Sequence, residues 1–172
     1  MIFYIADLHL NHTNIMKHCN RPFKDVQEMN KTIIENWNNK VKTNDKVYIL
    51  GDVCFVKRNE NPKEIIKLLK ELNGEKHLIL GNHDNSILYD KEFKELFKSI
   101  KMYDKITDGD SKVVLFHYPI EEWDGFFRGT YHIHGHTHNS NNIMKINNRF
   151  NAGVDIHNYT PVTLKEMIEK NS

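Results

Sequence analysis

Five short apolar runs in this chain are each followed at once by histidine, aspartate or asparagine, and this pattern limits the folds open to it. The runs precede the segments Asp7-Leu8-His9, Gly51-Asp52, Gly81-Asn82-His83-Asp84, His117 and Gly135-His136-Thr137-His138. Loops at the carboxyl ends of strands in an α/β sheet converge even when they are far apart in sequence. The pattern therefore predicts strands whose ends bring these polar side chains into one site.

The order of strand and helix patterns predicts the fold class. Strands are predicted over residues 2–6, 46–50 and 76–80, with helices over 25–41, from 61 to Gly74, and over 91–100. Beyond these, strands are predicted over 102–106, 112–116, 130–134, 143–146 and 149–152, and a last helix from Thr163 to about Glu169. Parallel strands need helical crossovers, whereas antiparallel strands need only turns. We therefore predict an α/β fold, a four-layer α/β/β/α sandwich of two mixed β-sheets flanked by helices.

Composition limits the kinds of partner and compartment. The chain of 172 residues shows no repeat and no linker rich in Pro, Gly or Ser, so we predict a single domain over 1–172. Its net charge of +1 provides no uniform field for nucleic acid or a membrane surface. Two cysteines cannot build a disulfide framework, and no apolar run approaches the roughly 20 residues of a membrane span. The N-terminus lacks the basic region of a signal peptide, so we expect a cytoplasmic protein.

The polar side chains at the strand ends have the chemistry of a metal centre. Imidazole and carboxylate without thiolate suit Mn, Fe, Zn, Co or Ni. The candidates are too many for one four-coordinate ion, but they suffice for two ions if one carboxylate bridges. They are Asp7, His9, Asp52, Asn82, His117, His136 and His138.

The spacing within the motifs supports convergence. Asp7 and His9 are separated by one residue and would point the same way on an extended segment, as would His136 and His138. The preceding glycines Gly51, Gly81 and Gly135 permit sharp backbone turns where side chains would crowd the metals.

The five motifs, in this order, resemble the calcineurin-like metallophosphoesterase superfamily, and the chain is most similar to a small single-domain bacterial and phage branch of it. The resemblance implies that one metal ion is held by Asp7, His9 and His138, that a second is held by Asn82, His117 and His136, and that Asp52 bridges both. It also implies that His83 is the catalytic histidine and that Asp84 orients it. Further similar stretches are Asn11-His12-Thr13-Asn14-Ile15, Arg21-Pro22-Phe23, His117-Tyr118-Pro119 with Trp123, and Val154-Asp155 with Pro161-Val162.

This chemistry indicates a dinuclear metal-dependent phosphoesterase, with Mn the first choice of ion. Two divalent ions about 3.5–4 Å apart can share a hydroxide that attacks phosphorus in line. His83 can protonate or stabilise the leaving oxygen, and a carboxylate at Asp84 can favour the imidazolium. We expect phosphodiesters of small or nucleotide-like type, because a short chain leaves little room for a cap domain over the site.

Other functions stay open at this point. A phosphomonoesterase, including a phosphoprotein phosphatase, would use the same site. A catalytically silent interaction module, like the retromer subunit of this fold, would be expected to lose ligands that this chain keeps. A mononuclear metal hydrolase of another fold would leave several motifs unexplained. No basic stripe indicates long nucleic acid as a partner, and a homodimer stays open because family members of this size often pair.

Most of the remaining histidines and cysteines are expected to have structural roles or to be solvated. His132 and His134 alternate on a predicted strand and are expected to be structural. The same holds for His18, His77 and His157, which we expect to be structural or solvated, while Cys19 and Cys54 are expected to be buried and not to bind metal. His12 follows the first motif, and its role as a substrate contact stays open.

The segment 123–129 carries two glycines around aromatic residues and an arginine. A packed loop is the favoured interpretation. The alternative is a mobile rim, in which Phe126 or Phe127 stacks on a base and Arg128 meets phosphate. Arg21 and Arg58 are weaker candidates for the same task.

Overall fold

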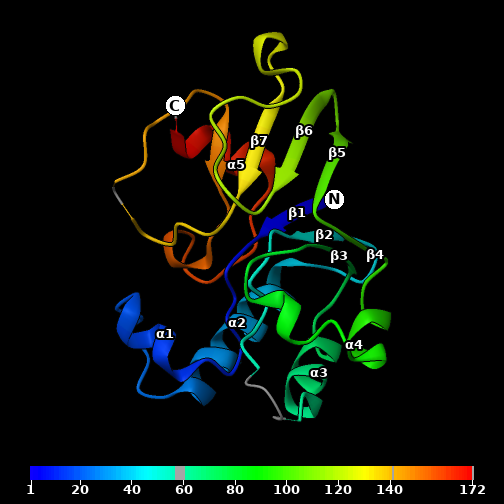
Figure 1. The fold of residues 1–172 in the computed structure, drawn as a ribbon, viewed down its shortest axis with the longest axis vertical. Coiled ribbons are helices and arrows are strands. Elements are labelled where there is room, and N and C mark those ends of the chain that lie inside the picture. The colour runs from blue at the N-terminus through cyan, green and yellow to red at the C-terminus, as the bar shows by residue number, and fades with distance from the viewer. Residues whose placement is uncertain (57–60, 141, 172) are drawn as a thin grey trace.

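The computed structural model describes residues 1–56, 61–140 and 142–171, so Arg58 lies outside the described residues. Two four-stranded sheets stack on each other (Figure 1). The first sheet contains, in spatial order, β1 (Ile2–Ile5), β2 (Lys46–Ile49), β3 (Glu75–Ile79) and β4 (Ser99–Lys101). The second contains β5 (Tyr103–Asp108), β6 (Ser111–Phe116), β7 (Tyr131–His134) and β8 (Arg149–Asn151).

Strand direction differs between the sheets. The four strands of the first sheet pair in parallel, and Val162 adds an antiparallel bridge to Tyr4 at the β1 edge. In the second sheet β5 and β6 are antiparallel, whereas β6, β7 and β8 are parallel. The prediction of two stacked sheets with flanking helices is confirmed, but of the two sheets predicted to be mixed, the first is parallel in its four strands and antiparallel only at the Val162 bridge. The helices are α1 (Thr13–His18), α2 (Val26–Lys40), α3 (Lys63–Lys70), α4 (Lys91–Glu95) and α5 (Leu164–Asn171).

The central position of the first sheet follows from its strand composition. Strand β1 is apolar at every position, as expected for a parallel strand covered on both faces. Phe3 and Ile5 pack in the cluster that contains Trp37 of α2, while Tyr4 belongs to the cluster that contains Leu115 of the second sheet. One apolar layer thus lies under the helices and a second lies between the sheets.

Two predicted elements differ from the structure, and one helix was missed. Helix α4 ends at Glu95 instead of continuing to residue 100, because residues 99–101 add a strand to the free edge of β3. The predicted strand over 143–146 is wrong for its described residues, which are irregular, and the backbone carbonyl of Met144 accepts a hydrogen bond from Arg149. Helix α1 was not predicted, since it has only six residues, of which only Ile15 is buried.

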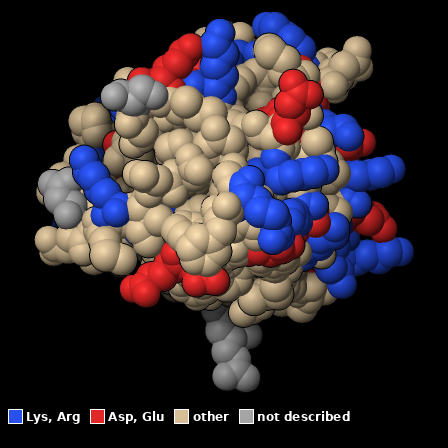
Figure 2. Space-filling model, turned by 90° about the horizontal axis from the view of Figure 1, so that it is seen from above, with Lys and Arg blue, Asp and Glu red and all other residues tan. Residues whose placement is uncertain are grey.

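The surface facing the viewer in Figure 2 carries charges of both signs. Lysine and arginine side chains gather toward one side of this face, and acidic side chains are interleaved with them. Within the described ranges, no helix has the length and apolar character needed to cross a membrane. The expectation that long nucleic acid does not bind stays a prediction.

The outer face of the second sheet buries His132 beneath the loop that leads into β7. The indole of Trp123 lies 5.2 Å from the His132 ring and donates to the carbonyl of Thr130. His132 Nδ1 faces the carbonyl of Val114 at 3.2 Å, and the N–H of Ile120 approaches Nε2 at 3.4 Å. Burial is the main cause that lowers the pKa of His132 to about 4. The ring is therefore neutral and structural, as predicted.

The buried His132 should make the protein sensitive to acid. Its pKa is lower in the folded than in the unfolded state, so the stability it contributes is complete above about pH 6.5 and is lost as the pH falls toward 4. The native protein should lose about 2–3 kcal/mol relative to His132→Leu between pH 7 and 4.5. Urea unfolding of both proteins across this range measures the difference, and parallel pH profiles would contradict the assignment.

Candidate metal centre

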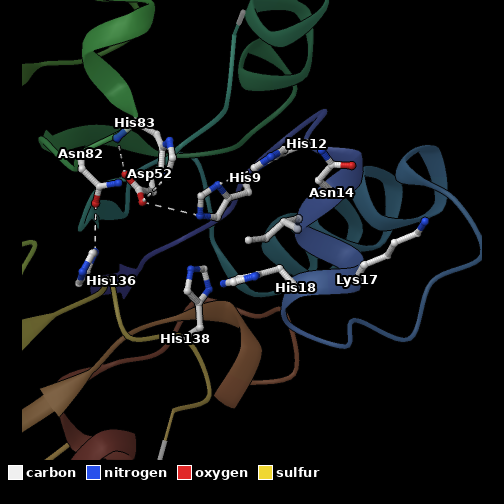
Figure 3. Close-up of a pocket in the computed structure, with 11 residues that line it drawn as sticks. His9, His12, Asn14, Lys17, His18, Asp52, Asn82, His83, His136 and His138 are labelled. Carbon is white, nitrogen blue, oxygen red and sulfur yellow. Dashed lines mark hydrogen bonds and ion pairs between the residues drawn. The ribbon is translucent and has the colours of Figure 1, made fainter. Parts of the chain in front are cut away.

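The predicted metal ligands gather where strands of both sheets end. Asp7 and His9 follow β1, Asp52 follows β2, Asn82 follows β3, and the remaining three follow β6 and β7. Figure 3 shows imidazole rings and Asp52 turned toward one another around a cavity of about 750 Å³. It is lined by His9, His12, Asn14, Ile15, Lys17, His18, Asp52, Asn82, His83, His136 and His138.

The ligand atoms fall into two groups. Atoms of Asp7, His9 and His138 lie within 4.8 Å of one another, and so do atoms of Asp52, His117 and His136. The first group is the set predicted for one ion. The second contains two of the three residues predicted for the other ion, together with the predicted bridge.

Asp52 belongs to the second group and also lies close to the first. Its Oδ2 atom is 3.7 Å from Nε2 of His9 and 3.6 Å from Nε2 of His117. Its Oδ1 atom accepts a hydrogen bond from the backbone N–H of His83 at 2.9 Å, which fixes the carboxylate plane. This geometry suits a carboxylate that serves both groups.

The hydrogen-bonding state of His9 and His117 fits a cation. Nε2 of His9 is buried and has no hydrogen-bond partner among the described residues. Nδ1 of His117 donates to the carbonyl of Leu50 at 2.7 Å, so its Nε2 carries a lone pair. That lone pair faces another acceptor, Oδ1 of Asn82, at 3.1 Å. A metal ion would satisfy atoms that otherwise lack donors.

Most of the ligands occupy strained backbone. Positive φ angles occur at five of the seven candidates: Asp7 (58°), His9 (49°), Asp52 (54°), His136 (69°) and His138 (47°). The expectation of an extended segment at the two paired motifs is therefore wrong. Left-handed backbone at residues with a Cβ is uncommon, and it persists where the surrounding structure enforces it.

Two glycines allow the ligand loops to approach closely. Gly51 has φ +86°, and a Cβ there would lie 2.5 Å from Nδ1 of His117 and 2.6 Å from the backbone of Gly81. A Cβ on Gly81 would lie 2.3 Å from Oδ1 of Asp52. Side chains at these positions would thus crowd the candidate ligands themselves, whereas the prediction concerned crowding of the metals.

Asp84 has a different partner from the predicted one. Its buried carboxylate accepts three backbone hydrogen bonds, from Asp52 and Gly81 on Oδ2 and from Val53 on Oδ1, at 2.8–2.9 Å. Burial raises the pKa of Asp84 to about 6, against the lowering effect of these hydrogen bonds. Both oxygens are directed at the backbone, so Asp84 positions the Asp52 loop and not the ring of His83.

Asp155 holds the His138 ring through its Nδ1 atom, and Arg21 in turn holds Asp155. Nδ1 of His138 donates to Oδ2 of Asp155 at 2.8 Å, which leaves Nε2 for a ligand. Arg21 binds both oxygens of Asp155 and donates to the backbone carbonyls of Leu8 and Asp7. Burial favours a raised pKa for Asp155, but the hydrogen bonds from His138 and Arg21 outweigh it and lower the pKa.

Arg21 is therefore corrected as a candidate phosphate contact, because its guanidinium is buried and fully occupied. Asp155 belonged to a stretch that carried the family resemblance, but no role was predicted for it. Apart from that resemblance, the sequence feature that could have indicated its role is an acidic residue close to a predicted strand end.

Burial raises the pKa of the candidate ligand Asp7 to about 7, while the charge of His138 acts in the opposite direction. Both oxygens of Asp7 also accept from the backbone N–H of His136 at 3.0 Å. Asp7 thus links the loop after β1 to the loop after β7.

Helix α1 forms one wall of the cavity. Nδ1 of His12 lies 3.3 Å from Nδ1 of His9, and the His12 ring stacks on Phe55 at 4.7 Å. His12 is thus positioned to touch a substrate. Asn14, Lys17 and His18 also line the cavity and were not predicted to do so. His18 was expected to be structural or solvated, and it is exposed at this wall.

Arg128 is not part of this cavity. It lies on the short helix η2 (Phe126–Arg128), which precedes β7, and it pairs with Asp124 at 3.3 Å. The ligands follow the carboxyl end of β7, so η2 lies at the other end of that strand (Figure 1). The prediction of Arg128 as a substrate contact is wrong for this reason.

The cysteines and His134 are buried as expected. His134 Nδ1 lies 2.8 Å from the carbonyl of Gly135, which is a structural contact. Cys54 is absent from the ligand groups found among the described residues. Cys19 was expected to be inert, and its sulfur lies within 4.8 Å of ligand atoms of His138 and Asp155.

A family model for the calcineurin-like phosphoesterases matches residues 1–156. The chain belongs to the calcineurin-like phosphoesterase family. Members of this family depend on metal, in agreement with the donor set described above. The resemblance inferred from the motifs is confirmed.

Relatives of this chain include proteins without an assigned role. An uncharacterized protein of Methanocaldococcus jannaschii is 41% identical, with 98% of this chain and 92% of the relative covered. A protein of unknown function from Aquifex aeolicus has 27% identity, a TM-score of 0.78, and coverage of 100% and 99%. An archaeal phosphodiesterase with 19% identity and a TM-score of 0.53 covers 88% of this chain and 81% of its own, and supports the fold alone.

Replacing Asp84 by asparagine should loosen the Asp52 loop. The amide group can accept with only one of its two heavy atoms, so at least one buried backbone N–H of residues 52, 53 or 81 loses its acceptor. We expect a loss of about 1–3 kcal/mol in the free energy of unfolding, together with weaker Mn binding. Urea unfolding and calorimetric titration measure the two effects.

Asp90→Asn is the matched control. Asp90 also accepts a backbone hydrogen bond, from Phe93 at the start of α4, but asparagine caps a helix equally well. Its stability and Mn binding should stay close to those of the native protein. Equal losses in both variants would show that Asp84 has no special role at the centre.

Proposed function

We propose that this chain is a dinuclear metal-dependent phosphoesterase acting on phosphodiesters of small or nucleotide-like molecules. The observation that carries the proposal is the position of Asp52 Oδ2, at 3.7 Å from His9 Nε2 and 3.6 Å from His117 Nε2. One carboxylate oxygen of the second group thus also lies close to a histidine of the first group. A single four-coordinate ion would leave one of these groups unused.

The proposed holders are the seven residues named from the sequence. Asp7, His9 and His138 would hold one ion, Asn82, His117 and His136 the other, with Asp52 shared. Bound Mn, or Fe, Zn, Co or Ni on the same donors, would supply an activated water and polarise the phosphoryl oxygens.

His83 is the proposed proton donor. Its Nε2 lies 4.0 Å from Asp52 Oδ2, and its side chain is 35% exposed at the cavity. The ring packs edge-on against Phe55 at 5.6 Å, and its backbone N–H is tied to Asp52. A histidine held beside the ligands and open to the cavity can give a proton to the leaving oxygen. Asp84 contributes by positioning the backbone of Asp52 and Gly81.

Hydrolysis of two model substrates tests the proposal. Protein stripped of metal and reloaded with Mn should cleave bis-p-nitrophenyl phosphate in preference to p-nitrophenyl phosphate. Asp52→Asn should lose turnover and bind less metal, because the shared ligand is weakened. His83→Ala should keep its metal and lose about 10²–10⁴-fold in kcat, since only the proton donor is removed.

His77→Ala is the control for His83→Ala. His77 lies on β3, bonds to Ser99 and Glu75, and is remote from the ligand groups, so its replacement should leave metal content and turnover unchanged. Preference for the monoester would favour a phosphatase. Absence of both metal binding and turnover would contradict the proposal and favour an interaction module.

A further inference from the structure

A second cavity adjoins the candidate metal centre. It has a volume of about 480 Å³, within the usual range for pockets that bind small molecules. Its walls include Pro119 after β6 and Ile143 in the loop after β7, and we refer to it as the Pro119–Ile143 cavity. The other lining residues are His18, Cys19, His136, Thr137, His138, Asn139 and Ser140.

The two cavities meet at the candidate metal ligands. His136 and His138 line both cavities, and they belong to different ligand groups. His18 is the third shared residue, and in Figure 3 its ring reaches from α1 toward His138. A phosphoryl group bound at the ligands would therefore lie at the boundary of both cavities. A phosphodiester has two ester arms and could place one in each, whereas a monoester has one arm.

The polar groups of the Pro119–Ile143 cavity match a ligand with hydroxyl groups. Oγ1 of Thr137 accepts from the amide of Asn151, and Oγ of Ser140 accepts from the backbone N–H of Asn142. Each hydroxyl therefore keeps its own proton for donation to a ligand. The amide nitrogen of Asn139 donates to the carbonyl of Cys19, so its oxygen stays an acceptor.

The charges of the two cavities differ. Lys17 and Asp52 line the first cavity, whereas the described lining of the Pro119–Ile143 cavity includes no lysine, arginine, aspartate or glutamate. Pro119 and Ile143 instead contribute apolar surface on which a ring or carbon chain can rest. Its lining thus favours an uncharged arm over an anionic one.

We infer that the Pro119–Ile143 cavity is a subsite for an uncharged, hydroxyl-bearing ester arm of a phosphodiester, such as a nucleoside or a polyol. The inference rests on the proposed phosphoesterase function and adds to it which arm is recognised, and by which residues. In this subsite Ile143 provides apolar contact and Ser140 donates a hydrogen bond.

Three p-nitrophenyl phosphodiesters with the same leaving group test this subsite in the Mn-loaded full chain. Their second arms are thymidine, glycerol and ethyl. We expect kcat/KM for the thymidine or the glycerol ester to exceed that for the ethyl ester by about tenfold, as one or two hydrogen bonds to polar groups of the arm would give. The comparison of thymidine with glycerol identifies which arm is recognised.

Two variants and one control test whether the preference over the ethyl ester depends on the Pro119–Ile143 cavity. Ile143→Trp should fill the cavity and remove the preference over the ethyl ester. Ser140→Ala, a smaller change, should lower that preference about two- to tenfold while metal content stays constant. Met144→Trp adds the same bulk at the next residue, which is 60% exposed and does not line the cavity, and should keep the preference.

The outcomes separate the two proposals. Metal-dependent hydrolysis of all three esters without preference would overturn the subsite and leave the phosphoesterase intact. A preference that survives both Ile143→Trp and Ser140→Ala would also overturn it. Failure of the Mn-loaded native protein to cleave any ester would instead overturn the phosphoesterase proposal, and the subsite with it.

Discussion

The buried guanidinium of Arg21 is the contact on which one half of the candidate metal centre depends. It binds both oxygens of Asp155 at 2.8 and 3.0 Å and donates to the backbone carbonyls of Leu8 and Asp7. A charge with 4% exposure is stable in the interior only when it is paired, so these partners must be in place together. Because Asp155 also holds His138, the loops after β1 and β7 are positioned as one unit.

Carboxylates bound to backbone amides stabilise the left-handed conformations of the ligands. Asp84 accepts from the N–H of Asp52, whose φ is 54°, and Asp7 accepts from the N–H of His136, whose φ is 69°. The Asp7 contact also joins the two ligand groups, since Asp7 belongs to one and His136 to the other. The backbone of the site is thus fixed by contacts within the chain, which lowers the reorganisation needed when a metal or substrate binds.

The sequence predicted that these candidate side chains converge, because each motif follows an apolar strand, and strand order determines where strand ends meet. It did not reveal the partner of Arg21, because Asp155 lies beyond β8 and outside the five motifs that directly follow apolar strands. It also misplaced Arg128, because its loop begins at the carboxyl end of β6 beside His117 and ends at the amino end of β7, and the sequence does not show how close to the site each loop residue lies. For Asp84 the motif suggested a side-chain partner, whereas the short turn after β3 directs the carboxylate to three amides. Helix α1 has too few buried residues to give a periodic pattern.

The distribution of carboxylates explains why this centre suits an anionic substrate. Of the acidic residues near the ligands, Asp155 is neutralised by Arg21, and Asp84 is directed at backbone amides. Among the residues that the structure describes, Asp7 and Asp52 would therefore be the acidic ligands, and Asn82 would supply a neutral oxygen. Two divalent ions, as proposed, would leave the centre net positive even after hydroxide binds. A phosphate ester would then be attracted most strongly as negative charge develops on its oxygens, and an aspartate in place of Asn82 would weaken that attraction.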